Sequence, residues 1–250
     1  MPKKRKKPVI CFTSLTDCEG CLFAILDLGQ RFFDLLKYFE LGNFDLIEEL
    51  PERPHYDIAI IEGTPITKEN FKRLKELRKK SDLLISLGAC AHLGGIQQIK
   101  NWQDKNKKIY QVYKKIKGLD NPDIQPIGKI VKVDFDIPQC PLNNEEFLKI
   151  MYQLKEGRMP KIPRRPVCYE CQIGEYECLL QKGQPCLGPI SIGGCQAICL
   201  ENGMYCEACR GTFKEAQIKG LRKIISKKTF DQTAQTYGAL DEIEEIEKAH

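Results

Sequence analysis

Cysteine is the residue type of this chain that is best suited to chemistry. The sequence holds 13 cysteines in 250 residues. Eight of them lie between Pro166 and Gly211, and four more are spread from Cys18 to Cys140. Four thiolates are the ligand set of a cubane iron–sulfur cluster. Twelve cysteines in three sets of four therefore predict three clusters, which together would conduct electrons through the chain.

The first set of cysteines follows the predicted strands of a parallel sheet. Short apolar runs predict buried strands at residues 8–14, 83–89 and 130–137, and a cysteine of the set follows each run. In an open parallel sheet the carboxyl ends of the strands meet at one edge, where ligands bind. The sequence therefore predicts one site that is built from three loops. The set consists of Cys18, Cys21, Cys90 and Cys140.

The eight later cysteines can be divided into two ligand sets in several ways, and their spacing does not choose between them. The ferredoxin run that interleaves the ligands of two clusters is absent from this stretch. A sequential division is the simplest one. It places Cys168, Cys171, Cys178 and Cys186 in one set, and Cys195, Cys199, Cys206 and Cys209 in the other. Because apolar periodicity is weak here, we expect metal ligation to supply the folding energy.

Other uses of cysteine compete with this interpretation. A disulfide framework is typical of small secreted chains, whereas residues 1–10 lack the apolar core of a signal peptide. Structural zinc takes the same four thiolates, and buried inert thiols are a further alternative. Zinc sites usually pair two short knuckles, but Cys90 and Cys140 stand alone on separate predicted loops. Electron transfer needs a series of neighbouring sites and zinc does not, so clusters are favoured.

Charge and hydropathy restrict the class of protein further. The formal net charge is +5 with every cysteine counted as neutral. Three oxidised clusters with their thiolates would add roughly −2 each, about −6 in total, and leave the chain close to neutral. We therefore expect no nucleic-acid partner and interpret the run from Lys3 to Lys7 as a solvated tail. No apolar run approaches the roughly 20 residues of a membrane span, so we expect a cytoplasmic protein without one.

Predicted strands and helices alternate along the first part of the chain, which indicates an α/β fold with a doubly wound parallel sheet. The further predicted elements are helices at 20–39, 67–80, 143–156 and 213–226, and strands at 44–49 and 57–63. A proline-rich linker follows residue 157. We expect a first domain at 8–157, a small loop-rich domain at 165–215, and a tail at 216–250 that is helical or partly disordered.

Several motifs around the cysteines resemble a known family. They are Asp17-Cys-Glu-Gly-Cys21, Leu87-Gly-Ala-Cys-Ala-His-Leu-Gly-Gly95, Pro138-Gln-Cys-Pro141, Pro185-Cys-Leu-Gly-Pro189 and Cys206-Glu-Ala-Cys-Arg-Gly211. Over about residues 8–215 the chain is similar to the small (delta) subunits of cytosolic [NiFe] hydrogenases of the sulfhydrogenase type. The small subunit of methyl-viologen-reducing hydrogenases is similar too, and the family is related to the 20 kDa subunit of respiratory complex I.

The resemblance implies a flavodoxin-like domain with a proximal [4Fe-4S] cluster, followed by a domain with a medial and a distal one. Its motifs assign Cys18, Cys21, Cys90 and Cys140 to the proximal cluster, Cys168, Cys171, Cys178 and Cys186 to the distal cluster, and Cys195, Cys199, Cys206 and Cys209 to the medial cluster. In membrane-bound relatives a histidine stands at the position of Cys168. Those relatives commonly lack the ligand that Cys199 supplies here, so the resemblance implies a full medial cubane.

The resemblance also implies partners. A large subunit would hold the nickel–iron site against the face around Cys18 and Cys90, and a flavin or iron–sulfur subunit would accept electrons near residues 168–186. This chain has no nickel-binding cysteine pairs, no Rossmann fingerprint and no P-loop, so we expect no catalytic residue on it. Two alternatives stay open: the iron–sulfur subunit of an oxidoreductase like complex I that has lost nickel, and a zinc-binding module that engages nucleic acid.

A few residues near the motifs have more than one interpretation. We expect Cys11, within the first strand, to be a packed thiol. His92 either shields the proximal cluster or has a packing or solvent role, and the second is favoured. Asp17 and Glu19 either assist proton exit or cap the helix that follows them.

Overall fold

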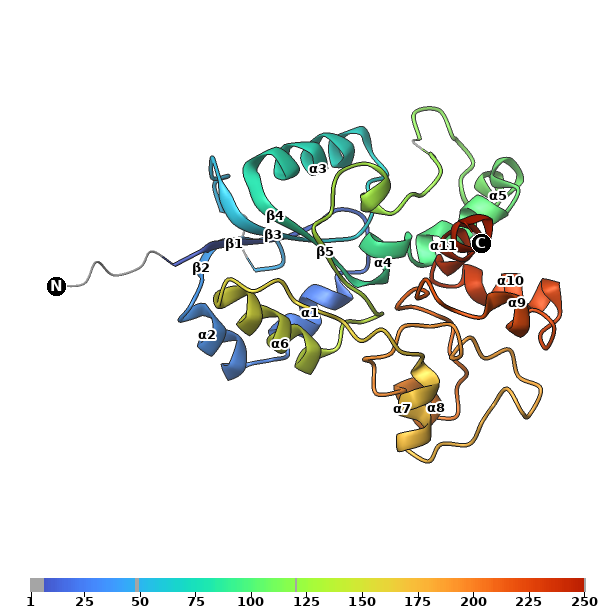
Figure 1. The fold of residues 1–250 in the computed structure, drawn as a ribbon. Coiled ribbons are helices and arrows are strands. Elements are labelled where there is room, and N and C mark those ends of the chain that lie inside the picture. Colours follow the sequence, from blue (N-terminus) through green and yellow to red (C-terminus); the bar gives the residue numbers. More distant parts are fainter. Residues whose placement is uncertain (1–6, 48–49, 120, 250) are drawn as a thin grey trace.

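The computed structural model describes residues 7–47, 50–119 and 121–249. Its centre is a parallel sheet with the strand order β2-β1-β3-β4-β5 (Figure 1). The strands are β1 (Val9–Ser14), β2 (Glu40–Phe44), β3 (Tyr56–Glu62), β4 (Ser81–Leu87) and β5 (Phe135–Ile137). This is the flavodoxin-like order of a doubly wound sheet, so the predicted fold class is confirmed.

Helices cover both faces of the sheet because successive strand residues point to opposite sides. The helices α1 (Gly20–Leu26), α2 (Gln30–Leu36) and α6 (Asn144–Lys155) cover one face, and α3 (Lys68–Lys80) covers the other (Figure 1). Phe12 packs with Phe32 and Phe147 in the core of the first face. Its neighbour Cys11 packs with Leu74 on the second face and is 1% exposed, as expected for a packed thiol.

The rest of the chain wraps around the carboxyl edge of the sheet in short helices and loops. These elements are α4 (Gly88–Leu93), η1 (Ile96–Trp102), α5 (Lys105–Val112), η2 (Ile127–Lys129), α7 (Val167–Ile173), α8 (Ile198–Glu201), α9 (Ile218–Leu221), α10 (Lys227–Gln235) and α11 (Ala239–Ala249). Phe230 of α10 and Ile243 of α11 share a core with Leu93 of α4 and with Leu187 and Ala208 of the cysteine-rich region. The C-terminal helices therefore brace that region.

Three predicted elements in the sheet region have different bounds in the structure. The helix expected at 20–39 is two helices, because Gly29 adopts a positive φ of 54° between them. The strand expected at 44–49 shares only Phe44 with β2, which spans Glu40–Phe44, and residues 45–47 form a turn; residues 48–49 lie outside the described residues. The strand expected at 83–89 ends at Leu87, because Gly88 has a φ of 78° and begins α4.

Two later predictions were too long. The strand expected at 130–137 is confined to the last three residues of that range, since Val131 and Val133 pack against the core from a turn that follows η2. The helix expected at 213–226 is the single turn α9. The tail expected at 216–250, as helical or partly disordered, holds the helices α9, α10 and α11 within its described residues.

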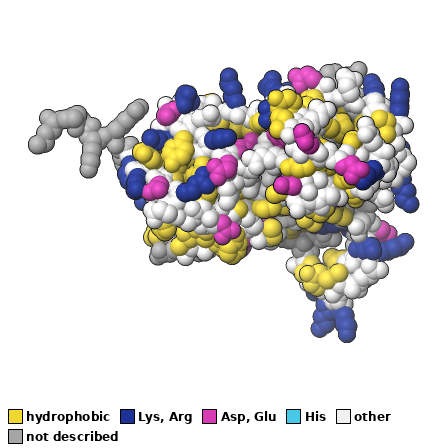
Figure 2. Space-filling model, turned by 90° about the horizontal axis from the view of Figure 1, so that it is seen from below, with side chains coloured by type: hydrophobic (Ala, Val, Ile, Leu, Met, Phe, Trp, Pro, Cys, Tyr) yellow, Lys and Arg dark blue, Asp and Glu magenta, His cyan; other side chains and the backbone are white. Residues whose placement is uncertain are grey.

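The described surface mixes both signs of charge. In the face that Figure 2 shows, lysine and arginine alternate with acidic side chains, and hydrophobic side chains lie between them. Lys3 to Lys6, which make up most of the basic run, lie outside the described residues. Within the described ranges, each helix is too short or too polar to cross a membrane.

Candidate metal centres

The fold brings the four cysteines of the first set to the carboxyl edge of the sheet. Cys18 lies between β1 and α1, Cys21 lies in α1, Cys90 lies in α4, and Cys140 follows β5. Burial raises the pKa of Cys90 to about 12, and the neighbouring charges of Cys140 and Cys18 act in the same direction. The amide of Ala89 donates to the carbonyl of Gln139 at 2.9 Å, which ties α4 to the Cys140 loop.

Two glycines make room for these sulfurs. A Cβ at Gly88 would lie 2.5 Å from the Sγ of Cys21, and a Cβ at Gly95 would lie 2.6 Å from the Sγ of Cys90. Both glycines also have positive φ, of 78° and 66°. Any other residue at these positions would displace the sulfur or strain the backbone.

Glu62, at the end of β3, holds the N-terminus of α1. Its carboxylate is 1% exposed and accepts from the amides of Cys21 at 3.0 Å and Leu22 at 2.9 Å. Burial raises its pKa to about 7, and the charge of Asp17 adds to this shift. Glu19 is the N-cap residue but makes no side-chain capping bond, while Asp17 accepts from its amide at 2.7 Å. The capping role considered for these two residues thus falls to Glu62.

The cysteines of the last set line one small cavity of about 50 Å³. They are Cys195, Cys199, Cys206 and Cys209. The Oγ of Ser191 lies 3.4 Å from the Sγ of Cys206, and a carboxylate oxygen of Glu170 lies 3.9 Å from the Sγ of Cys195. The cavity therefore has polar groups directed at its sulfurs.

The remaining set is gathered around α7. A Cβ at Gly188 would lie 3.4 Å from the Sγ of Cys186 and 3.5 Å from the Sγ of Cys168. Burial raises the pKa of Cys168 to about 11, and the charges of Cys186, Cys171 and Cys178 contribute in that order. The four cysteines that are consecutive in the sequence are thus also close to one another in space. This set adjoins the last one, because the amide of Cys206 donates to the Sγ of Cys186 at 3.4 Å.

The backbone next to the cysteines is unusual. Six described residues other than glycine have positive φ values, and five of them lie within two residues of a cysteine of these sets: Glu19, Gln139, Gln196, Ala197 and Ala208. The sixth, Glu175, is three residues before Cys178. Such turns direct successive amides into a concavity that binds anions, and many iron–sulfur sites use them. The amides of Ala197 and Ala208 donate to the sulfurs of Cys195 and Cys206. Strain of this kind gathers at functional sites.

The donor sets fit iron–sulfur clusters better than single zinc ions. Zinc holds four sulfurs at about 2.3 Å from the metal, which places them within roughly 4 Å of one another. Among the described residues, the only three candidate ligand atoms that lie within 4.8 Å of one another belong to His55, Asp57 and Asp82. The cysteine sulfurs are therefore spread more widely, as ligands of a multi-iron core would be.

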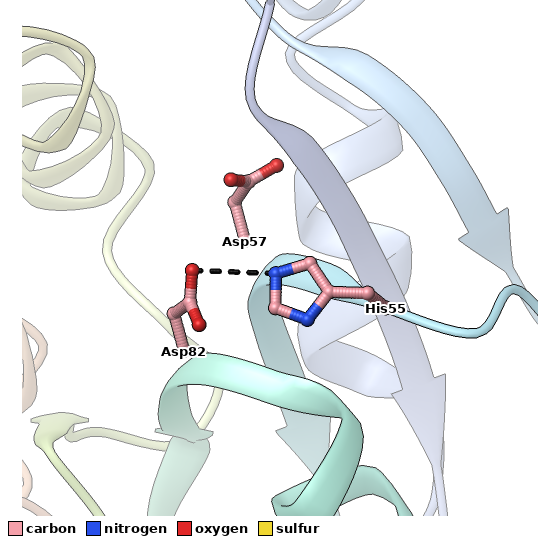
Figure 3. A group of neighbouring side chains, drawn as sticks. All are labelled: His55, Asp57 and Asp82. Atoms are coloured by element: carbon pink, nitrogen blue, oxygen red, sulfur yellow. Dashed lines mark ion pairs between the residues drawn. The ribbon is translucent and has the colours of Figure 1, made fainter.

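The group of His55, Asp57 and Asp82 lies at the opposite edge of the sheet, near the starts of β3 and β4 (Figure 3). The ring of His55 is 3.3 Å from Asp82, but these side chains are 54% and 66% exposed. Asp57 accepts from the backbone amide of Val9 at 2.6 Å. An exposed pair of this kind contributes little, so we assign it no site.

His92 belongs to a partly buried polar cluster beside the first cysteine set. Its Nδ1 is 3.3 Å from Asp136, which also accepts from the hydroxyl of Ser86. Burial lowers the pKa of His92, but the bond to Asp136 and the charge of Glu242 raise it above its usual value overall. The ring thus links α4 with β5 and α11, which agrees with the packing role favoured from the sequence.

Comparisons with known proteins show which family the chain belongs to. The sequence model described as NADH ubiquinone oxidoreductase, 20 Kd subunit, matches residues 18–154, more than half of the chain. The chain belongs to this family. The delta subunit of sulfhydrogenase 2 from Pyrococcus furiosus is 36% identical over 215 residues, which cover 85% of this chain and 90% of that relative. The resemblance indicated by the cysteine motifs is thus confirmed.

Solved structures agree with this assignment. A chain of an NAD+-reducing [NiFe]-hydrogenase in the H2-reduced state is 28% identical with a TM-score of 0.56, and the match covers 63% of this chain and 96% of that one. A chain of the actinobacterial-type NiFe-hydrogenase from Ralstonia eutropha H16 is 16% identical with a TM-score of 0.60, over 98% of this chain and 92% of that one. The second likeness concerns the fold alone, but it extends over the cysteine-rich region as well.

Three residues of the site were missed in the sequence. Glu62 and Arg210 act on cysteine loops that are distant in sequence, and Tyr237 reaches the last set from the end of α10. Burial raises the pKa of Tyr237 to about 12, and the charges of Cys140 and Cys209 add to this. The sequence offers a signal for Glu62 alone: it is a charged residue that directly follows four apolar residues of a predicted strand.

Proposed function

We propose that this chain is the electron-transfer small subunit of a [NiFe] hydrogenase. It relays electrons between a nickel–iron site on a large subunit and an acceptor subunit, through three [4Fe-4S] clusters. The observation that carries the proposal is the grouping of twelve cysteines into three neighbouring sets in a chain whose relatives are named as hydrogenase subunits. The proposed order along the relay is proximal, medial and distal.

The proposed ligand sets follow the three groups in space. The proximal ligands are Cys18, Cys21, Cys90 and Cys140, the medial ligands are Cys195, Cys199, Cys206 and Cys209, and the distal ligands are Cys168, Cys171, Cys178 and Cys186. The cavity shared by the medial cysteines and the crowding at Gly188 support the sequential division.

The clusters supply one-electron chemistry when they are bound, and the chain's own residues set the conditions for it. The thiolates hold the iron, while the amides of Ala197, Ala208 and Cys206 donate to sulfurs and stabilise the negative charge there. Burial of Cys21 and Cys206 keeps water away from the cores. Closely spaced sites then let an electron pass without a mobile carrier.

The exposure of two cysteines indicates where partner subunits would bind. Cys18 is exposed although its three companions are not, and the nearby Phe23 is 53% exposed. A cluster with one open side and an apolar side chain beside it is completed by a covering protein, which we assign to the large subunit. Cys178 is exposed in the distal set, where a flavin or iron–sulfur subunit would accept electrons for NAD(P)+ or another acceptor. We place the complex in the cytoplasm, where thiols stay reduced.

Anaerobic purification of the chain with its partners, followed by metal analysis, tests the proposal. We expect about twelve irons per chain with matching sulfide, by the four-iron content of each cubane, and nickel only in the large subunit. Zinc in place of iron would refute both the clusters and the relay. Hydrogen-dependent reduction of the clusters, followed by their absorbance, checks the direction of electron entry.

A second function is favoured by the match to the complex I subunit family over residues 18–154. In that case the clusters would be present but the large partner would lack nickel. The same purified complex distinguishes the two: clusters without nickel, and without reduction by hydrogen, would support the second function.

A further inference from the structure

Arg210 directly follows Cys209, and its side chain is 1% exposed. A buried guanidinium is costly unless charged and polar partners surround it. Its Nη1 and Nη2 donate to the two carboxylate oxygens of Glu146 in α6, at 2.7 and 2.8 Å. A fork-shaped pairing of this kind fixes direction as well as distance.

The other donors of Arg210 hold two cysteine loops. Nη1 donates to the side-chain oxygen of Gln139 at 3.0 Å, and Gln139 precedes Cys140 of the proximal set. Nε donates to the carbonyls of Ile192 and Gly193 at 3.2 and 3.0 Å, just before Cys195. One side chain therefore connects the first domain to the loop that begins the medial set.

The proximal and medial sites share a wall at this point. The cavity that the medial cysteines line is also bordered by Gln139, Cys140, Arg210 and Tyr237. The amide of Cys140 donates to the sulfur of Cys209. A change in the Cys140 loop would thus change the medial site directly.

The charge of Arg210 acts on the medial sulfurs. Its side chain borders the cavity that the four medial cysteines line, so a positive charge lies beside their sulfurs. A carboxylate oxygen of Glu170, with the opposite charge, lies 3.9 Å from the Sγ of Cys195. In a poorly solvated site, a nearby cation stabilises the extra electron of a reduced cluster.

We propose that Arg210 is a positioning residue of the relay: it fixes the spacing between the proximal and medial clusters and raises the reduction potential of the medial one. This inference rests on the proposed function. It assigns a part to a buried residue that is not one of the proposed cluster ligands.

The test compares Arg210→Met with Arg210→Lys in the anaerobically purified complex. Redox titration followed by electron paramagnetic resonance gives the potential of the medial cluster and its magnetic coupling to the proximal one. We expect Arg210→Met to retain its iron, to shift the medial potential to a more negative value and to weaken the coupling. Arg210→Lys keeps the charge and should recover most of the potential, but less of the coupling.

Arg222→Met is the matched control, because Arg222 also pairs with two carboxylates, Asp231 and Glu247. Among the described residues its hydrogen bonds reach no cysteine loop, and methionine can keep an apolar contact with the ring of Phe230, which the guanidinium covers. It should leave potential and coupling unchanged. If Arg210→Met keeps its iron with wild-type potential and coupling, or if Arg222→Met shifts them equally, the inference is wrong. Wild-type protein without iron would instead refute the proposed function.

Arg210→Met leaves the carboxylate of Glu146 unpaired and could lose iron for that reason alone. The double variant Arg210→Met with Glu146→Leu removes both charges and keeps the volume, which is the tolerated way to replace a buried pair. A lower medial potential in the double variant supports the inference, and a wild-type potential overturns it.

Discussion

At the scale of single residues, the space beside each sulfur is the tightest constraint. Gly88 and Gly157 both have positive φ, at 78° and 72°, but a Cβ at Gly157 would have no heavy atom within 4 Å. The two positions therefore share the backbone cost of a substitution and differ only in crowding.

Gly88→Ala should displace Cys21 and release iron from the proximal site, because the new Cβ would lie 2.5 Å from the sulfur. Gly157→Ala should cost about 1 kcal/mol of unfolding free energy, for the left-handed backbone alone, and keep all its iron. Iron content and thermal unfolding of the two variants check this. Equal iron in both would contradict the crowding argument.

The proposed role of Cys199 as the fourth medial ligand is open to a direct test. Cys199→Ser should reduce the iron content of the medial site and change its paramagnetic signal, because Cys199 lines the same cavity as the other three cysteines. Cys11→Ala is the control, since Cys11 lies in β1, away from every set, and its loss should leave the iron unchanged. A Cys199→Ser variant with full iron would remove Cys199 from the ligand set.

At the scale of elements, ion pairs of Asp134 stabilise the position of the edge strand β5. Asp134, just before β5, is paired with Arg78 of α3 and accepts from the amide of Leu84 in β4 at 3.0 Å. Burial alone would raise the pKa of Asp134. The hydrogen bonds from the amide of Leu84 and from the side chains of Arg78 and Lys132, together with the charge of Arg78, outweigh burial and lower the pKa to about 2.

Asp134→Asn should destabilise the protein by roughly 1–3 kcal/mol at pH 7, the usual cost of leaving buried partners unmatched. A carboxyl with a lowered pKa stabilises the fold above its unfolded pKa, so this contribution is lost as the pH falls from about 4 towards 2. The gap in thermal stability between wild type and variant should therefore narrow over that range. Asp82→Asn, at a 66% exposed side chain, is the control and should behave like the wild type throughout.

The C-terminal helices support the cysteine-rich region, and Phe230 of α10 is the test of this support. Its side chain is fully buried against a core that includes Leu187 and Ala208, which adjoin Cys186 and Cys209. Phe230→Ala should cost about 3–5 kcal/mol, typical of a buried phenylalanine, and should reduce the iron content. Ile224→Ala, at a 66% exposed side chain, should alter neither. If Phe230→Ala unfolds more easily but keeps its iron, the helices do not support the clusters.

The elements that could be predicted from the sequence are those with a strong local pattern. Apolar runs locate β1 and β3, and helical periodicity with Thr67 and Asn143 at the N-caps locates α3 and α6. The errors at β2 and β5 have a common cause. The apolar residues around these strands also pack from turns, as Val131 and Val133 do, and periodicity does not distinguish a turn from a strand.

At the scale of the whole molecule, topology made the first cysteine set predictable. The rule that parallel strands end at one edge is sufficient to bring Cys18, Cys90 and Cys140 together. Glu62 and Arg210 were not predictable in this way, because each depends on where loops from distant parts of the chain approach one another. The proposed division of the last eight cysteines likewise draws its support from the three-dimensional arrangement and not from their spacing.

The long span of the first cysteine set has a consequence for how the cell makes this protein. Its four members extend from residue 18 to residue 140, whereas the medial set occupies one short stretch after residue 194. The ribosome therefore releases Cys18 and Cys21 well before β5 and Cys140 exist to complete their site. During that interval the two thiols are open to oxygen and to the wrong metal. The complete ligand set that we propose for the proximal cluster can therefore form only after residue 140 has been made, when every strand of the sheet is already present.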